Sequence, residues 1–109
     1  MKNRTKNFEI IYSTTESLKE AKRIAKTLVE EKLVACVNIF KINSIYKWKG
    51  KIFDTYEYAM IIKTKKKLLD AAMKRIKELH SYETPCIISF RISKGDRKFL
   101  EWIEKETKE

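Results

Sequence analysis

The feature that most limits the fold is a long apolar ribbon around one tight-turn signal. Two runs rich in β-branched and aromatic residues, 33–48 and 51–64, flank Lys49-Gly50. Glycine readily adopts the positive φ that a two-residue hairpin turn needs. Both runs are far longer than an average strand of about five or six residues. The sequence therefore predicts an extended β-hairpin, which must be covered by something because isolated ribbons are marginal in water.

Two amphipathic helices accompany the hairpin, one before it and one after it. Apolar residues recur at helical spacing over 15–31, and we expect Ser13 and Glu16 to form a capping box ahead of that helix. The second helix is expected to follow a Thr64 cap and to end near His80. Each helix is thus predicted to lie between two strands.

Short apolar runs at 8–13 and 86–92 read as the first and last strands, and an amphipathic helix closes the chain, with Phe99 and Trp102 expected to be packing residues. The order is βαββαβ followed by a helix. This split βαβ pattern predicts an α+β, ferredoxin-like fold, in which both helices lie on one face of a four-stranded antiparallel sheet. With only two Gly and one Pro, no linker divides the chain, and we expect a single domain over 1–109.

The second face of the predicted sheet needs cover as well. The central strands are apolar or aromatic at nearly every position, and the terminal helix is too short to shield them all. Self-assembly is the simplest solution, because the hairpin of one copy can pack on or extend the sheet of the next in a closed ring. The alternative is a bent ribbon that folds back over its own sheet.

The composition favours anionic partners and argues against several functional classes. Lys and Arg total 25 against 15 Asp and Glu, a formal charge of +10, so a basic nucleic-acid-binding module with steeply salt-dependent affinity is one alternative. Against it, the strands lack the aromatic signature of RNA-recognition modules. With one His and no evident nucleophile–base pair, we expect no enzymatic activity.

The predicted location is the cytoplasm. The chain has no apolar run of the roughly 20 residues that cross a bilayer, so we expect no membrane partner, and its polar start lacks a secretory signal. Cys36 and Cys86 are far apart and form no CxxC motif, so they are expected to be buried, reduced thiols.

Several segments resemble one known family. Their order and spacing are similar to those of the CutA divalent-cation tolerance proteins, over Ile10 to Ile103. The segments are ACVNI, SIYKWKGKI, MIIKT, ELHSYETP and FLEWI. The resemblance implies a homotrimer of ferredoxin-like subunits whose hairpins form intersubunit sheets. It also implies a role in copper and other divalent-cation tolerance or response, with metal ions or a small effector bound between subunits, no required cofactor and no enzymatic reaction.

The resemblance also bears on copper binding. In bacterial members credited with copper ligation, the proposed ligands correspond to Ser13, Leu79 and His80 of this chain, so only one of the three is kept. His80, Glu83 and Cys86 form an alternative set, since their N, O and S donors suit Cu or Zn. The competing interpretation is that His80 caps the helix or compensates its dipole.

A small anionic effector is the second candidate ligand. Four lysines crowd the start of the second helix, where a bound anion would offset their unfavourable interaction with the helix dipole. They are Lys63, Lys65, Lys66 and Lys67. A solvated basic face is the competing interpretation.

The resemblance places four residues at or near the intersubunit cleft: Trp48, Glu57, Lys63 and Tyr82. Tyr46 shares one face of the hairpin with Trp48 by strand alternation. We interpret these two rings as interface packing, with ligand stacking as the alternative.

Overall fold

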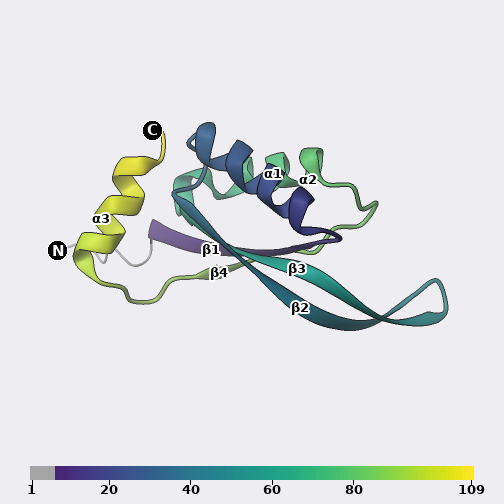
Figure 1. Ribbon diagram of the computed structural model, residues 1–109. Coiled ribbons are helices and arrows are strands. Elements are labelled where there is room, and N and C mark those ends of the chain that lie inside the picture. The colour runs from purple at the N-terminus through teal and green to yellow at the C-terminus, as the bar shows by residue number, and fades with distance from the viewer. Residues whose placement is uncertain (1–6) are drawn as a thin grey trace.

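The computed structural model describes residues 7–109 and contains the predicted elements in the predicted order (Figure 1). The helices and strands are β1 (Phe8–Thr15), α1 (Leu18–Glu30), β2 (Cys36–Trp48), β3 (Lys51–Lys65), α2 (Leu69–Leu79), β4 (Ile87–Arg91) and α3 (Arg97–Glu106). A short 3-10 helix, η2 (Lys66–Leu68), joins β3 to α2. The single-domain prediction and the prediction of no secretory signal both include residues 1–6, which lie outside the described residues.

The four strands form one antiparallel sheet in the order β2-β3-β1-β4. Helices α1 and α2 lie side by side on one face of it (Figure 1). Helix α3 lies at the end of the sheet where β1 begins (Figure 1). This topology confirms the predicted ferredoxin-like fold, with β1 and β3 in the centre and β2 and β4 at the edges.

The β2–β3 hairpin extends well past the sheet. β2 and β3 pair over their whole length, whereas β1 reaches only to Tyr58 of β3. The rest of the hairpin projects as a two-stranded ribbon, so the chain is 51 Å long but only 25 and 21 Å across (Figure 1). At the tip, Lys49 and Gly50 have φ of 50° and 80°, as a type I′ turn requires. The predicted turn and extended hairpin are confirmed.

The main core lies between the two helices and the sheet. Every second strand residue points to this face, and α1 presents an apolar stripe at helical spacing. Each fully buried large aliphatic side chain contributes about 1.5–3 kcal/mol by leaving water. The largest of them are Ile11, Ile24, Leu28, Met60, Ile62 and Ile76.

Helix α1 begins at a different cap from the predicted one. Ser17 is the N-cap, and its hydroxyl accepts a hydrogen bond from the Glu20 N–H at 3.1 Å. Ser13 lies inside β1, opposite Met60, and its buried Oγ has no hydrogen-bond partner. The prediction that Ser13 caps the helix is wrong because the pairing of β1 with β3 continues to Thr15.

Thr64 does not cap the second helix either. It lies within β3, and its Oγ1 donates a hydrogen bond to the Leu33 carbonyl at 2.6 Å. The strand continues to Lys65, and the chain then enters α2 through η2 without a side-chain cap. The predicted end of α2 is confirmed, since the helix stops at Leu79 with His80 as its C-cap.

Helix α3 covers only one end of the second sheet face. Leu100 and Ile103 are buried against Phe8. Phe99 and Trp102 stay 43% and 40% exposed and stack on each other with ring centroids 5.7 Å apart. They pack on each other but not into the core, because this helix turns one narrow stripe to the sheet and both residues lie beside it.

The rest of the second sheet face is open. Phe40 on β2 and Ile88 and Phe90 on β4 are 42%, 48% and 54% exposed. By strand alternation and register, they point away from the face that α1 and α2 cover. As predicted, the helices leave apolar surface uncovered on this side.

Two smaller predictions concern the thiols and the membrane. Cys36 and Cys86 are free thiols, but both are half-buried rather than buried. Within residues 7–109, no helix combines the length and the apolar character needed to cross a membrane.

Two buried hydroxyl groups of the sheet should respond differently to removal. Thr64→Val leaves the Leu33 carbonyl without its donor, so the free energy of unfolding should fall by about 1–2 kcal/mol. Ser13→Ala removes a hydroxyl that has no partner, so stability should be unchanged or higher. Denaturant unfolding at one protein concentration, followed by circular dichroism, measures both. Equal destabilisation of the two variants would contradict this account of Ser13.

Candidate functional site

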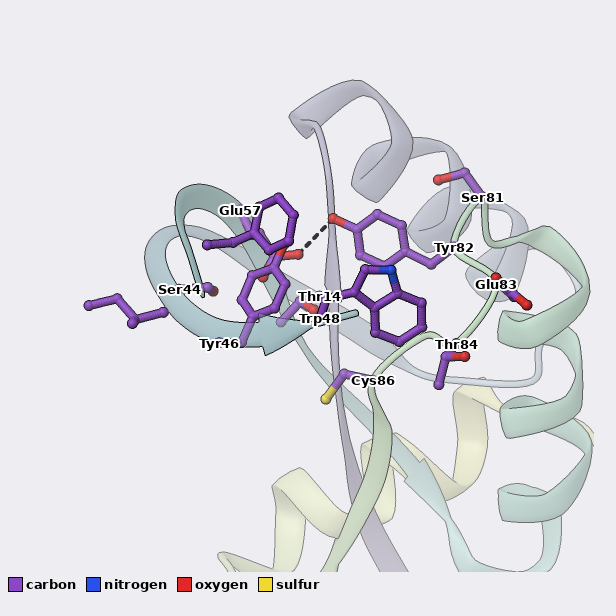
Figure 2. Close-up of a pocket in the computed structure, with 12 residues that line it drawn as sticks. Thr14, Ser44, Tyr46, Trp48, Glu57, Ser81, Tyr82, Glu83, Thr84 and Cys86 are labelled. Carbon is purple, nitrogen blue, oxygen red and sulfur yellow. Dashed lines mark hydrogen bonds between the residues drawn. The ribbon is translucent and has the colours of Figure 1, made fainter. Parts of the chain in front are cut away.

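A cavity of about 660 Å³ lies between the projecting hairpin and the α2–β4 loop, residues 80–86 (Figure 2). Its volume is within the range of sites that hold small organic molecules. We call it the hairpin pocket. Its aromatic and acidic lining residues are Tyr46, Trp48, Phe53, Glu57, Tyr82 and Glu83.

The hairpin supplies three aromatic rings to one side of the pocket. Tyr46 and Trp48 are two residues apart on β2, and Phe53 lies directly opposite Tyr46 on β3, so strand alternation brings all three to one face. The Tyr46 and Phe53 rings stack, with centroids 5.4 Å apart. Figure 2 shows the ring of Tyr82, from the α2–β4 loop, alongside those of Tyr46 and Trp48.

Glu57 is the buried carboxylate of the pocket. Only 7% of its surface is exposed, and its Oε2 accepts a hydrogen bond from the Tyr82 hydroxyl at 2.7 Å (Figure 2). In the described part of the chain, no donor reaches Oε1 and no cationic side chain pairs with Glu57. Because a buried carboxylate is unfavourable without compensating partners, the polar chemistry of the pocket centres on this residue.

Helix α1 holds the α2–β4 loop in place. The Glu20 carboxylate, 9% exposed, accepts hydrogen bonds from the N–H and the hydroxyl of Ser81 at 2.8 and 3.0 Å. Arg23 donates to the Leu79 carbonyl at 3.0 Å, which satisfies a free acceptor at the end of α2. These contacts fix the loop that carries Tyr82.

Both ring nitrogens of His80 are engaged within the protein. Its Nε2–H donates to the Thr14 carbonyl at 2.7 Å, and its Nδ1 accepts from the Tyr82 N–H at 3.0 Å. The side chain has no exposed surface, and Nδ1 lies 3.8 Å from the Glu20 carboxylate. His80 therefore occupies the C-cap position of α2 and orients the loop, but these two bonds join it to β1 and to the loop and not to a carbonyl of α2.

The predicted metal ligands His80, Glu83 and Cys86 are not brought together as a set. Glu83 and Cys86 line the pocket, but His80 does not. Over the described range, no group of three His, Cys, Asp or Glu side chains is arranged to hold a metal ion. Burial, reinforced by the charge of Glu57, raises the pKa of the Cys86 thiol, which disfavours the thiolate that binds metals.

Of the predicted cleft residues, Trp48, Glu57 and Tyr82 share the hairpin pocket, but Lys63 does not. Lys63 lies six residues beyond Glu57 on β3, and its ammonium group donates to Asn38 Oδ1. In this single chain, Lys63 is therefore separate from the other three.

The lysines of the predicted anion site are also divided. Lys65 is 5% exposed and pairs with Glu104 of α3 at 2.9 Å. Lys66 and Lys67 are exposed on η2, which is only three residues long. Lys63 and Lys65 are thus each bound to a partner within the chain, Asn38 and Glu104.

Phe53 and Thr14 are among the lining residues that the sequence did not predict as part of a site. The position of Phe53 could have been predicted from the sequence, because a two-residue turn at Lys49-Gly50 places it opposite Tyr46. No sequence pattern predicts Thr14 as a pocket residue, because it lines the pocket only through the pairing of the end of β1 with β3.

The Tyr82 phenol has a strongly perturbed pKa. Burial raises this pKa well above the ordinary value of 10.0, and the hydrogen bond to Glu57 and the charge of that carboxylate raise it further. The pKa of Tyr12 is also raised, first by burial and then by the charges of Cys86 and Glu57. The phenol at Tyr82 thus stays a hydrogen-bond donor at neutral pH.

Comparison with known proteins places these features in context. The sequence profile of one family, described as CutA1 divalent ion tolerance protein, matches residues 9–106. A protein from Archaeoglobus fulgidus, named divalent-cation tolerance protein CutA, is 50% identical over 95 residues, which are 87% of this chain and 93% of the relative. A Pyrococcus horikoshii protein of the same name is 37% identical over 99 residues, 91% of this chain and 97% of the relative.

Solved structures agree with the fold. One described as the periplasmic divalent cation tolerance protein CutA from Archaeoglobus fulgidus has a TM-score of 0.88 at 47% identity, and the match covers 91% of this chain and 97% of that one. The crystal structure of CutA1 from Oryza sativa has a TM-score of 0.92 at 39% identity, covering 98% and 99%.

Raising the pH should destabilise the protein through Tyr82. Its folded pKa lies above the ordinary 10.0, so its stabilising contribution is complete below pH 10.0 and is lost as the pH rises through the folded value. Between about pH 8 and pH 11, the free energy of unfolding should fall more for the wild type than for Tyr82→Phe. Tyr56→Phe, at a position 66% exposed, serves as the control. Parallel curves for the wild type and Tyr82→Phe would refute the assignment.

Proposed function

The chain belongs to the CutA1 family of divalent ion tolerance proteins, and from that premise we propose that it acts as a non-enzymatic protein whose hairpin pocket binds a small effector. The observation that carries the proposal is the pocket itself, with three hairpin rings, a buried carboxylate and a braced loop around about 660 Å³. Its thiol has a raised pKa, and the nearby His80 has both nitrogens bound. Neither group is arranged as a nucleophile or a general base.

Direct ligation of copper or zinc is the alternative use of this region. It would require His80 to give up two hydrogen bonds and Cys86 to ionise against a raised pKa. The family positions that the resemblance credits with copper ligation hold Ser13 and Leu79, neither of which is a copper ligand. These costs favour a role in cation tolerance through effector binding.

The proposal includes assembly into a homotrimer. The open sheet face carries the exposed residues Phe40, Ile88 and Phe90, and the outer edges of β2 and β4 have no partner strand within residues 7–109. Cyclic assembly satisfies such edges and apolar faces together. In the trimer, the hairpin pocket would lie at an intersubunit cleft, and a neighbouring copy would complete its surroundings.

The proposed location is the cytoplasm. The free thiols Cys36 and Cys86 are compatible with a reducing compartment. The Archaeoglobus fulgidus structure is described as a periplasmic protein, so cell fractionation of the native protein is the direct check, and recovery outside the cytoplasm would refute this part.

Disrupting the open face should dissociate the trimer. Phe90→Asp places a charge on that face, so sedimentation at micromolar concentration should shift from three times the 13.0 kDa chain mass toward one. Leu18→Asp changes a residue of similar character, 39% exposed on α1, and should leave the assembly intact. A wild-type protein that sediments as a single chain would refute the trimer.

Effector binding is tested by calorimetric titration of the assembled protein with Cu²⁺, Zn²⁺, nucleotides, amines and a short oligonucleotide. At least one organic ligand should bind, and Trp48→Ala should weaken it about tenfold or more, equivalent to about 1.4 kcal/mol. Trp102→Ala is the matched control, because the two indoles are 41% and 40% exposed and only Trp48 lines the pocket.

The other outcomes of this titration are also decisive. Binding of Cu²⁺ or Zn²⁺ that His80→Ala abolishes would support the metal alternative instead. Salt-dependent binding of the oligonucleotide alone would support the nucleic-acid alternative. If nothing binds, the effector proposal is wrong.

A further inference from the structure

The hairpin pocket has the opposite electrostatic character from the rest of the chain. The sequence carries 25 Lys and Arg against 15 Asp and Glu, a formal charge of +10. The lining of the pocket nevertheless includes the carboxylates of Glu57 and Glu83 and none of the Lys, Arg or His residues that the structure describes. A site for an anion would be expected to have basic groups, so the part of the pocket that one chain supplies is better suited to a cation.

The geometry at Glu57 points the same way. Glu57 as a residue is only 7% exposed, and the hydroxyl of Tyr82 donates a hydrogen bond to one of its carboxylate oxygens. The other oxygen has no donor among the described residues and is not sealed from solvent. A buried carboxylate is stabilised most by a charged partner, so the free oxygen is the natural contact for a positively charged group in the cavity.

The walls of the pocket suit an organic cation. Tyr46, Trp48, Phe53 and Tyr82 all line it, and aromatic faces attract ammonium groups through their quadrupoles, as in the cages that hold quaternary ammonium ligands. Rings of this hairpin already attract ammonium groups elsewhere. The Lys41 Nζ lies 4.4 Å from the centroid of the Tyr56 ring.

A second such contact lies at the tip of the hairpin, next to the pocket residue Trp48. The Nζ of Lys49 lies 5.8 Å from the centroid of the Trp48 ring, although Lys49 is not a lining residue. The Trp48 indole thus already lies near one ammonium group of its own chain.

An inorganic divalent ion fits this lining less well. Mg²⁺ and Ca²⁺ take six or more oxygen ligands, and Zn²⁺ takes about four N, O or S donors. The described residues offer no cluster of three such side chains. Because burial raises the pKa of Cys86 and Tyr82, neither adds an anionic donor at neutral pH.

We propose that the hairpin pocket binds an organic ammonium ion, with the rings of Tyr46, Trp48, Phe53 and Tyr82 around the cationic head and Glu57 as its counter-ion. This inference rests on the proposed function, which makes the pocket an effector site, and adds the charge and the chemical class of the effector. The volume of the pocket, about 660 Å³, is large enough for a small alkylammonium compound and its substituents.

The test compares two probes of the same shape by calorimetry on the assembled protein. Choline carries a quaternary ammonium head, and 3,3-dimethylbutan-1-ol has the same outline without the charge. We expect choline to bind at least about tenfold more tightly. Glu57→Gln should reduce choline affinity by about tenfold or more while still offering Tyr82 an acceptor, whereas Glu106→Gln, exposed on α3, should leave it unchanged.

Four results would overturn the inference. They are no choline binding, equal binding of choline and the alcohol, unchanged choline affinity in Glu57→Gln, and displacement of choline by millimolar Zn²⁺ or Mg²⁺. If Glu57→Gln fails to fold, the comparison of the two probes on the wild-type protein decides the question alone. A nucleotide or other anion that binds in a Trp48-dependent way, without choline binding, would refute the organic cation and leave the proposed function intact. Absence of binding by every probe would refute both.

Discussion

The β2–β3 hairpin extends farther than the sheet can support it. Over residues 51–57, β3 has only β2 beside it, so neither face of the ribbon is covered by the main core. Tyr46, Trp48 and Phe53 nevertheless stand on one of those faces. The α2–β4 loop approaches from the body of the domain and is joined to the ribbon by the bond between Tyr82 and Glu57, but it does not fill the gap. The pocket is the space left by this incomplete cover.

The α2–β4 loop has a defined shape because the side chains of Glu20 and His80, both potential metal ligands or acid–base groups, form hydrogen bonds to it. Glu20 binds Ser81, and His80 bridges the backbone of Thr14 and that of Tyr82. A buried group whose hydrogen bonds are complete gains little from a new ligand, because binding first requires those bonds to break. This explains why potential metal donors occur close together in the sequence without forming a metal centre in the structure.

Membership of a divalent ion tolerance family does not require this chain to hold the metal itself. Tolerance describes an outcome for the cell, whereas the pocket describes what one molecule can recognise. The lining combines Glu57 and Glu83 with aromatic rings inside a basic protein, and the proposed recognition of an effector is compatible with the proposed assembly through the open face. Both proposals involve the projecting hairpin, which supplies one wall of the pocket and an exposed strand edge.

By itself, the sequence determined the element order, the turn at the hairpin tip and the ferredoxin-like sheet, because alternation, helical spacing and glycine conformation are local properties. The predicted cap, Ser13, was wrong because Ser17 begins the same S-x-x-E pattern four residues later and only strand pairing separates the two. Tertiary structure alone decided that His80 binds a carbonyl 66 residues away and that Glu57 meets Tyr82 across 25 residues. Such contacts depend on how segments that are far apart in the sequence approach one another in space, and the local spacing of residues does not predict that approach.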